Sequence, residues 1–123
     1  MIPGASAERV VLVERGDTAE RVGSGDLPVL ATPRLLAFVE GACVACVAGL
    51  LSDELTTAGT RVVLDHLAPS AMGTLVTIRV RLDGVNGRHL VFTFEVSHGN
   101  GTVVAAGEHH RVVVDREAFL SRL

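Results

Sequence analysis

The chain has 123 residues, of which 48% are apolar and 20% charged, and its formal net charge is −3 from 11 basic and 14 acidic residues. This length predicts one domain, residues 1–123, with enough apolar sequence for a core. Such a mildly acidic chain, with four Phe and no Trp or Tyr, is a poor nucleic-acid binder, because phosphates bind basic faces and bases stack on aromatic rings.

The cysteines and the N-terminus both bear on the cellular compartment. Cys43 and Cys46 are the only cysteines, and they are too few and too close in sequence for a disulfide framework. The first ten residues, MIPGASAERV, lack the basic segment and the apolar run of a signal peptide. We therefore expect a cytoplasmic protein.

The first half of the chain predicts one strand and one long helix. Residues 7–14 (AERVVLVE) favour a short strand, whereas the polar, Gly-rich residues 15–28 are typical of an excursion over the surface. Thr32 and Pro33 suit the N-cap and the first position of a helix, which we expect to end between residues 49 and 53.

The apolar part of this helix also raises a membrane interpretation. Its residues 35–51, LLAFVEGACVACVAGLL, carry a single charge, Glu40, near the middle. A spanning helix needs about 20 apolar residues and no unpaired central carboxylate. We therefore expect a helix buried in a soluble protein and no membrane partner. Gly41, inside the helix, leaves room for another backbone to approach.

The second half changes to the two-residue period of β-strands. It predicts four consecutive antiparallel strands at residues 60–68, 74–83, 89–97 and 102–114, followed by a short helical tail at 115–123. Turn sequences separate the strands, and Asn-Gly at 100–101 is the strongest hairpin signal among them. The inward faces of the second and third of these strands are apolar: Val76, Ile78, Val80 and Leu82, then Leu90, Phe92, Phe94 and Val96.

One apolar helix placed before an antiparallel meander predicts an α+β protein of the hotdog architecture. In it a long central helix is wrapped by a curved antiparallel sheet of about five strands. An open sheet has an edge that must be covered or paired. Pairing across a two-fold axis is the simplest solution, so we expect a homodimer, with a higher oligomer as a possible extension.

Several segments, taken in order, resemble the hotdog-fold acyl-CoA thioesterases, in the branch that contains fluoroacetyl-CoA thioesterase. They are VGSGDLPVLATP (22–33), LLAFVEGACV (35–44), Gly59-Thr60, VVLDHLAPSAMG (62–73) and GEHHRVVVDREAF (107–119). The resemblance covers residues 8–120 and rests on the order and spacing of these segments together. It implies an active site that uses Thr32, Glu40, Gly59, His66 and Arg111, all of which have the residue type of that branch.

One stretch departs from the pattern of that branch. The fluoroacetyl-specific enzyme has a Phe at the entrance of its acyl pocket, a few residues before the Thr that matches Thr32. Here the stretch is Gly25-Asp26-Leu27-Pro28, which contains no aromatic residue. General thioester hydrolysis remains the expectation, whereas selection for fluorine is not expected.

Glu40 and His66 carry the expected acid–base chemistry. Glu40 has apolar helical neighbours, so we expect a desolvated carboxylate that acts as general base, with a structural carboxylate held by an N–H or an Arg as the alternative. His66 shares a strand face with Val62 and Leu64 and therefore points at the helix, where it is expected to partner Glu40. The alternative is a core histidine bonded to the backbone.

The other three candidates each have a plainer interpretation. The Thr32 hydroxyl caps the helix, or it serves as nucleophile or positions the attacking water. Gly59 is a turn glycine, or it donates a backbone N–H to the thioester oxygen. Arg111 holds a phosphate of coenzyme A, anchors a carboxylate, or makes an ordinary interface ion pair.

No metal or cofactor is expected, since coenzyme A is part of the substrate. His109 and His110 are adjacent in a strand and so point to opposite faces, where one ion cannot bind both. Cys43 and Cys46 spell CxxC, but they lie in the middle of an apolar helix, whereas redox pairs lie at helix N-termini. We interpret them as small buried apolar side chains.

The sequence thus predicts a thioesterase that hydrolyses a small or medium acyl-CoA or acyl-carrier thioester. A non-catalytic acyl-CoA-binding hotdog domain is the main alternative, and a hotdog dehydratase is a weaker one. Thr32 and Glu40 are eight residues apart, which is about 12 Å along a helix and about 80° around it. Because one thioester carbon is hard to reach from both, we expect each site to be built from two chains.

Overall fold

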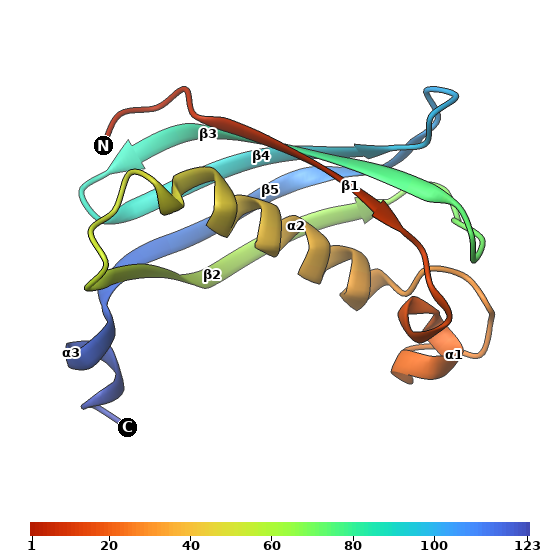
Figure 1. Ribbon diagram of the computed structural model, residues 1–123, viewed down its shortest axis with the longest axis horizontal. Coiled ribbons are helices and arrows are strands. Elements are labelled where there is room, and N and C mark those ends of the chain that lie inside the picture. The colour runs from red at the N-terminus through yellow and green to blue at the C-terminus, as the bar shows by residue number, and fades with distance from the viewer.

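The computed structural model describes all 123 residues and contains five strands and one long helix (Figure 1). In chain order the elements are β1 (Ser6–Leu12), the 3-10 turn η1 (Arg15–Asp17), α1 (Ala19–Val22), α2 (Thr32–Ala48), β2 (Leu55–His66), β3 (Leu75–Asn86), β4 (His89–Ser97), β5 (Val103–Asp115) and α3 (Arg116–Leu120). The expected order of strand, helix and four-strand meander is therefore confirmed.

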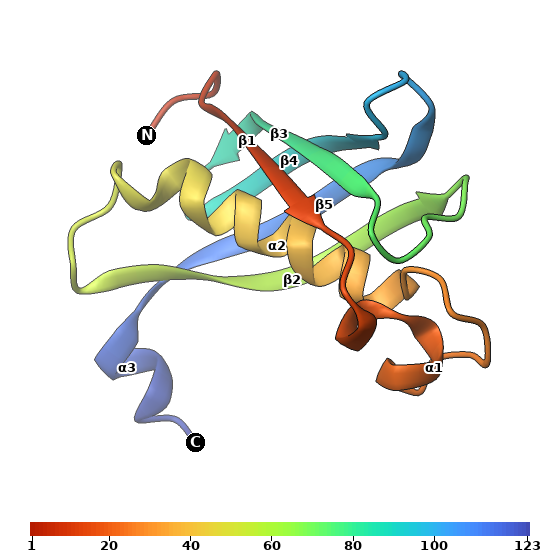
Figure 2. The same ribbon diagram turned by 45° about the vertical axis from the view of Figure 1, so that its right-hand side comes forward.

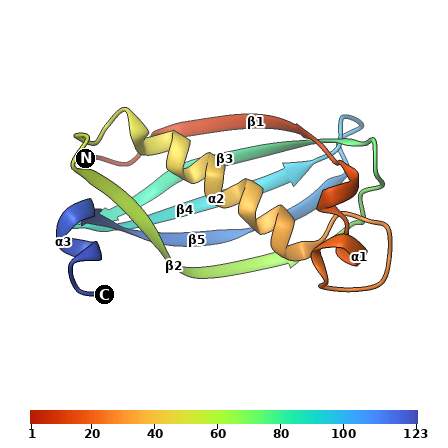
Figure 3. The same cartoon turned by 60° about the horizontal axis from the view of Figure 1, so that its bottom comes forward.

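The five strands form one antiparallel sheet in the order β1-β3-β4-β5-β2. The sheet is curved, and α2 lies diagonally across its concave face (Figure 3). β1 and β2, the strands that flank α2 in the sequence, form the two edges of the sheet. This arrangement matches the expected helix wrapped by a five-stranded sheet.

The core lies between α2 and the concave face of the sheet. The helix contributes Leu35, Phe38, Val39, Ala42, Cys43 and Val47. The predicted inward residues of β3 and β4 are all buried, and they pack in the same cluster. On β5 the inward face is interrupted by two buried polar residues, His109 and Arg111, which lie between Ala105 and Val113.

The edge strand β2 begins five residues earlier than expected, at Leu55 rather than Thr60. Gly59 therefore lies inside a strand and not in a turn, and the register with β5 shifts between Gly59 and Arg61. Tertiary pairing with β5 keeps residues 55–59 extended, although their sequence, with two Thr and a Gly, has weak apolar alternation. The interpretation of Gly59 as a turn glycine is wrong.

The expected surface excursion at residues 15–28 is partly wrong. Asp17 and Thr18 are 7% and 0% exposed, and the Asp17 carboxylate accepts hydrogen bonds from the backbone N–H of Glu14 and from Arg34 on α2. The Ala31 N–H also donates to the Asp17 carbonyl. These bonds fasten the start of α2 to the η1 turn that follows β1, and within this stretch residues 15–16 and 20–28 are exposed.

The central helix has 17 residues, and no helix in the structure combines the length and apolarity needed to cross a bilayer. Cys43 is buried and Cys46 half-buried, and both are free thiols. Burial raises the pKa of the Cys43 thiol to about 12, so it behaves as a small apolar side chain. Nη1 of Arg9 from β1 lies 2.8 Å from where a Cβ on Gly41 would be, so this gap is filled from within the chain.

Candidate active site

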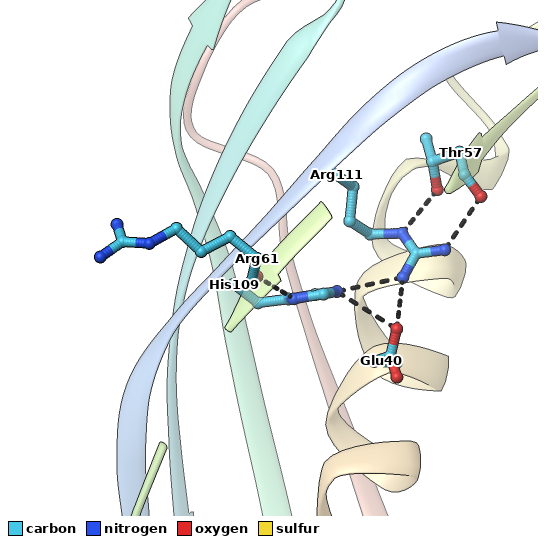
Figure 4. A network of polar contacts seen from close by, with 5 residues as sticks. All are labelled: Glu40, Thr57, Arg61, His109 and Arg111. Carbon is cyan, nitrogen blue, oxygen red and sulfur yellow. Dashed lines mark hydrogen bonds and ion pairs between the residues drawn. The ribbon is translucent and has the colours of Figure 1, made fainter. Parts of the chain in front are cut away.

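Glu40 projects from the middle of α2 towards β2 and β5 (Figure 4). Its Oε2 lies 3.0 Å from Nη1 of Arg111 and 3.5 Å from Nε2 of His109. Its Oε1 has no hydrogen bond or ion pair in the chain. The Glu40 side chain is 39% exposed, so the expectation of a desolvated carboxylate is wrong for the single chain. It is instead a carboxylate anchored through one oxygen.

Arg111 anchors this carboxylate within the chain, which is one of its three expected roles. It is 6% exposed and belongs to the inward face of β5. Its Nε donates to the Thr57 hydroxyl at 2.8 Å and its Nη2 to the Thr57 carbonyl at 2.9 Å. The guanidinium thus joins β2 to α2 through charge-assisted hydrogen bonds, which are stronger than neutral ones.

His109, like Thr57, belongs to this cluster although sequence reasoning did not assign it to the site. It is 2% exposed, its Nδ1 lies 2.8 Å from the Arg61 carbonyl, and its Nε2 lies 3.0 Å from Nη1 of Arg111. Burial lowers the pKa of His109, so the ring is neutral at pH 7 and the Glu40 contact is not an ion pair. The sequence could have indicated His109, because it lies two residues before Arg111 and therefore on the same strand face.

Gly59 closes the cluster on the β2 side. A Cβ at this position would lie 2.8 Å from Oε2 of Glu40, 3.2 Å from Cε1 of His109 and 3.3 Å from Nη1 of Arg111. Contacts below 3.0 Å require something to shift, and here the neighbours are held by their own hydrogen bonds. Any larger residue would therefore displace the carboxylate from Arg111.

Thr32 and His66 form a second, separate polar pair. Oγ1 of Thr32 lies 2.7 Å from Nδ1 of His66, across the start of α2 and the end of β2. The N-cap of α2 is Ala31, and no side chain caps it. The helix-cap interpretation of the Thr32 hydroxyl is therefore wrong. The hydroxyl instead bonds to Nδ1 of His66, which is 34 residues away in the sequence.

His66 has the properties of a neutral imidazole. Burial lowers its pKa, and its Nε2 is buried with no hydrogen-bond partner in the chain. An unpartnered buried ring nitrogen is unusual, since such groups are normally satisfied. The expectation that His66 partners Glu40 is wrong within one chain, where each residue bonds to a different cluster.

The two pairs open into different cavities. Thr32 and His66 line a cavity of about 380 Å³, formed by the loop before α2 and the segment after β2. These two segments lie at the end of the molecule that carries α1 (Figure 2). Leu27, Leu30 and Leu67 are among its apolar residues, and its lining contains no Phe, Tyr or Trp.

Glu40, Gly59 and His109 line another cavity, of about 390 Å³. The two linings have no residue in common. One chain therefore presents all five expected site residues, but in two separate clusters, one with Thr32 and His66 and the other with Glu40, Gly59 and Arg111.

The expected orientation of the adjacent histidines is confirmed. His109 faces the helix, whereas His110 lies on the other side of β5 and contacts His89, with 3.0 Å between His110 Nδ1 and His89 Nε2. No group of three or more His, Cys, Asp or Glu side chains has an arrangement that could hold a metal ion. That the protein uses no cofactor stays a prediction.

Comparison with known proteins identifies the family of this chain. A sequence model described as fluoroacetyl-CoA-specific thioesterase matches residues 13–117. The fluoroacetyl-CoA thioesterase of Streptantibioticus cattleyicolor is 30% identical over 95 residues, which are 77% of this chain and 68% of that protein.

Solved structures agree over nearly the whole chain. A fluoroacetyl-CoA thioesterase structure superposes with a TM-score of 0.92 at 26% identity and covers 99% of this chain and 94% of the other. A hot-dog-like protein from Thermanaerovibrio acidaminovorans gives 0.88 at 26% identity, with 98% and 88% covered. The predicted hotdog fold is thereby confirmed, and the chain belongs to the family of fluoroacetyl-CoA-specific thioesterases.

Proposed function

We propose that this protein hydrolyses a small or medium acyl-CoA thioester to the free acid and coenzyme A, with Glu40 as general base. The activity class, acyl-CoA thioester hydrolysis, is confirmed by family membership. The observation that carries the residue assignment is the anchored carboxylate: Arg111 holds Oε2 of Glu40 and leaves Oε1 free beside a cavity.

The chemistry follows from what each group can do. Oε1 of Glu40 takes a proton from water, the water oxygen bonds to the acyl carbon, and the carbon–sulfur bond breaks. The proton then passes to the leaving sulfur, so the carboxylate is regenerated. The backbone N–H of Gly59 stabilises the developing oxyanion. Arg111 acts through Glu40 rather than on the substrate, because it is buried and four of its five N–H groups donate to Thr57, His109 and Glu40.

The Thr32–His66 pair supplies the other side of the site. A neutral His66 accepts a proton from the Thr32 hydroxyl through Nδ1, which suits that hydroxyl either as a nucleophile or as a group that orients the attacking water. The two roles differ in kinetics. A covalent acyl-Thr32 intermediate gives a burst of thiol release equal to the number of sites, whereas water attack gives none.

The complete site is built across a homodimer. The two half-sites of one chain line separate cavities, so the Thr32 side of one chain must meet the Glu40 side of another. α2 and β2 carry exposed apolar side chains, namely Val44, Val62 and Val63, which suit burial against a second copy. β2 is also an edge strand that lacks a second neighbour.

Subunit complementation tests the shared site. Thr32→Ala and Glu40→Gln proteins, each inactive alone, are mixed under conditions that exchange subunits. A heterodimer then holds one intact and one doubly defective site, so random exchange restores about a quarter of wild-type activity. If mass spectrometry confirms exchange and no activity returns, each site is built within one chain.

The acyl preference is a separate part of the proposal. The cavity beside Thr32 has no Phe, Tyr or Trp in its lining, so fluoroacetyl-CoA should not be strongly preferred over acetyl-CoA. A panel of acyl-CoA and acyl-carrier thioesters with a thiol-release readout tests this. A ratio of kcat/KM above about 10³, or about 4 kcal/mol, would contradict it.

The same panel separates the alternatives. A non-catalytic acyl-CoA-binding domain would bind these thioesters in calorimetry and release no thiol. A hotdog dehydratase would form an enoyl product from a 3-hydroxyacyl thioester without cleaving it. We further propose that the protein works in the cytoplasm, which is supported by free thiols at both cysteines.

A further inference from the structure

His109 lies beside both Arg111 and Glu40, but the chemistry above does not use it. Nδ1 of His109 lies 2.8 Å from the Arg61 carbonyl, an oxygen that can only accept, so Nδ1 carries the proton (Figure 4). In a neutral ring Nε2 is then a lone pair. That lone pair faces Nη1 of Arg111 at 3.0 Å and accepts its hydrogen bond.

Arg111 needs this acceptor because it is buried. Nη1 has two hydrogens, and its two neighbours, Nε2 of His109 and Oε2 of Glu40, are both 3.0 Å away. Together they fix the direction in which Nη1 presents each hydrogen. Arg111 is 6% exposed, so water cannot easily replace a missing acceptor. Without Nε2, the guanidinium would keep one N–H unpaired or turn further towards Glu40.

We propose that His109 is a positioning residue, whose Nε2 lone pair holds Arg111 so that it binds Glu40 through Oε2 alone and leaves Oε1 free for the reaction. This inference rests on the proposed role of Glu40 as general base. His109 does so as a neutral acceptor between the buried cation and the backbone of β2. A carboxylate in its place would compete with Glu40 for Arg111, and an apolar ring would leave Nη1 unpaired.

Two amide substitutions separate the acceptor from the anchor. The Gln side chain is as long as the path to Nε2, so His109→Gln supplies an acceptor oxygen to Arg111. The Asn side chain is as long as the path to Nδ1, so His109→Asn keeps the bond to the Arg61 carbonyl and lacks the acceptor. His110→Asn, on the opposite face of β5, is the matched control.

The measurements are steady-state kinetics on an acyl-CoA that the wild type hydrolyses, with the melting temperature of each variant. We expect His109→Asn to lower kcat by about 10- to 100-fold with little change in KM, because His109 is 2% exposed and acts through Arg111 and Glu40. His109→Gln should keep kcat within a few-fold of wild type, even if its melting temperature falls as much as that of His109→Asn. Equal kcat for the Asn and Gln variants, or a loss confined to KM, would overturn the proposal.

A second measurement uses the unmodified protein, in case the Asn variant fails to fold. The ¹⁵N chemical shifts of His109 at pH 7 should show a protonated Nδ1 and an unprotonated Nε2, and a protonated Nε2 would overturn the proposal. Failure here is distinct from failure of the proposed function. A folded Glu40→Gln protein with full turnover removes Glu40 as base, whereas wild-type kcat in His109→Asn alone removes only the positioning role.

Discussion

The two polar clusters of this chain, which we propose to be half-sites of a shared active site, are built in opposite ways. Glu40 lies in a network in which Arg111, Thr57 and His109 are all less than 10% exposed and Arg111 hydrogen-bonds to the other two and to Glu40. Thr32 and His66 form a single exposed hydrogen bond between a helix start and a strand end, and Nε2 of His66 has no partner. The first half-site is fixed in position by the core, whereas the second is left with free bonding capacity.

This difference indicates a division of labour. Positioning a base precisely requires a connected network, because a shift of about 1 Å can cost about 100-fold in rate. A group that meets substrate or a second chain needs unsatisfied hydrogen-bonding capacity instead. We therefore expect changes around Glu40 to act through geometry and changes around Thr32 to act through direct contact.

The largest expected effect comes from breaking the anchored half-site at its centre. Glu40→Gln should lower kcat by at least about 100-fold, the contribution of a positioned general base. Because Arg111 stays buried and charged without its carboxylate partner, we also expect a lower melting temperature. Stopped-flow thiol release and circular dichroism measure the two effects. Wild-type turnover in a folded variant would exclude Glu40 as base.

Gly59→Ala should break the same half-site by crowding rather than by loss of charge. Its Cβ would lie 2.8 Å from Oε2 of Glu40, so we expect kcat to fall by about 10-fold or more as the carboxylate leaves its position. Gly99→Ala is the matched control, since no atom lies within 4 Å of its Cβ and its φ is not positive. Equal kcat in the two variants would show that the cluster adapts.

Low pH should lower the stability of the folded protein through the two neutral histidines, one in each cluster. Burial lowers the pKa of both His66 and His109, so the unfolded chain binds more protons than the folded one below pH 6.5. The free energy of unfolding should therefore be constant above that pH and fall as the pH drops from 6.5 through the folded pKa values. Urea titrations across pH 4–8 measure this.

The matched variants assign the acid effect to each half-site. His109→Gln and His66→Asn should each flatten part of the pH dependence of stability, because each removes one buried group that resists protonation. A wild-type protein whose stability does not fall between pH 6.5 and 4 would contradict the neutral assignment of both rings.

The smallest effect is expected at Gly41, next to Glu40 on α2. Gly41→Ala should stabilise the helix by up to about 1 kcal/mol, because only the mobile end of Arg9 occupies the space of the new Cβ. Thermal unfolding measures the gain, and sedimentation velocity reports whether association changes. A loss of association would show that a second chain, and not Arg9 alone, approaches at Gly41.

Local patterns in the sequence were enough for most of the fold. The alternation of Val76 to Leu82 and of Leu90 to Val96 placed β3 and β4 and their buried faces correctly. The boundary of β2 was wrong, because pairing with β5 and not local propensity keeps residues 55–59 extended. Asp17 was also missed, since its burial depends on Arg34 and on the backbone of Glu14.

Sequence alone determined the residue types of the site, the hotdog architecture and the thioesterase family, because these depend on periodicity and on the order of motifs along the chain. Tertiary structure decided the partners. Glu40 and Arg111 are 71 residues apart and Thr32 and His66 are 34 apart, and no local rule pairs side chains at such separations. Curvature of the sheet around α2 creates these contacts. It places His109 beside Arg111, and it brings His66 to Thr32 rather than to Glu40.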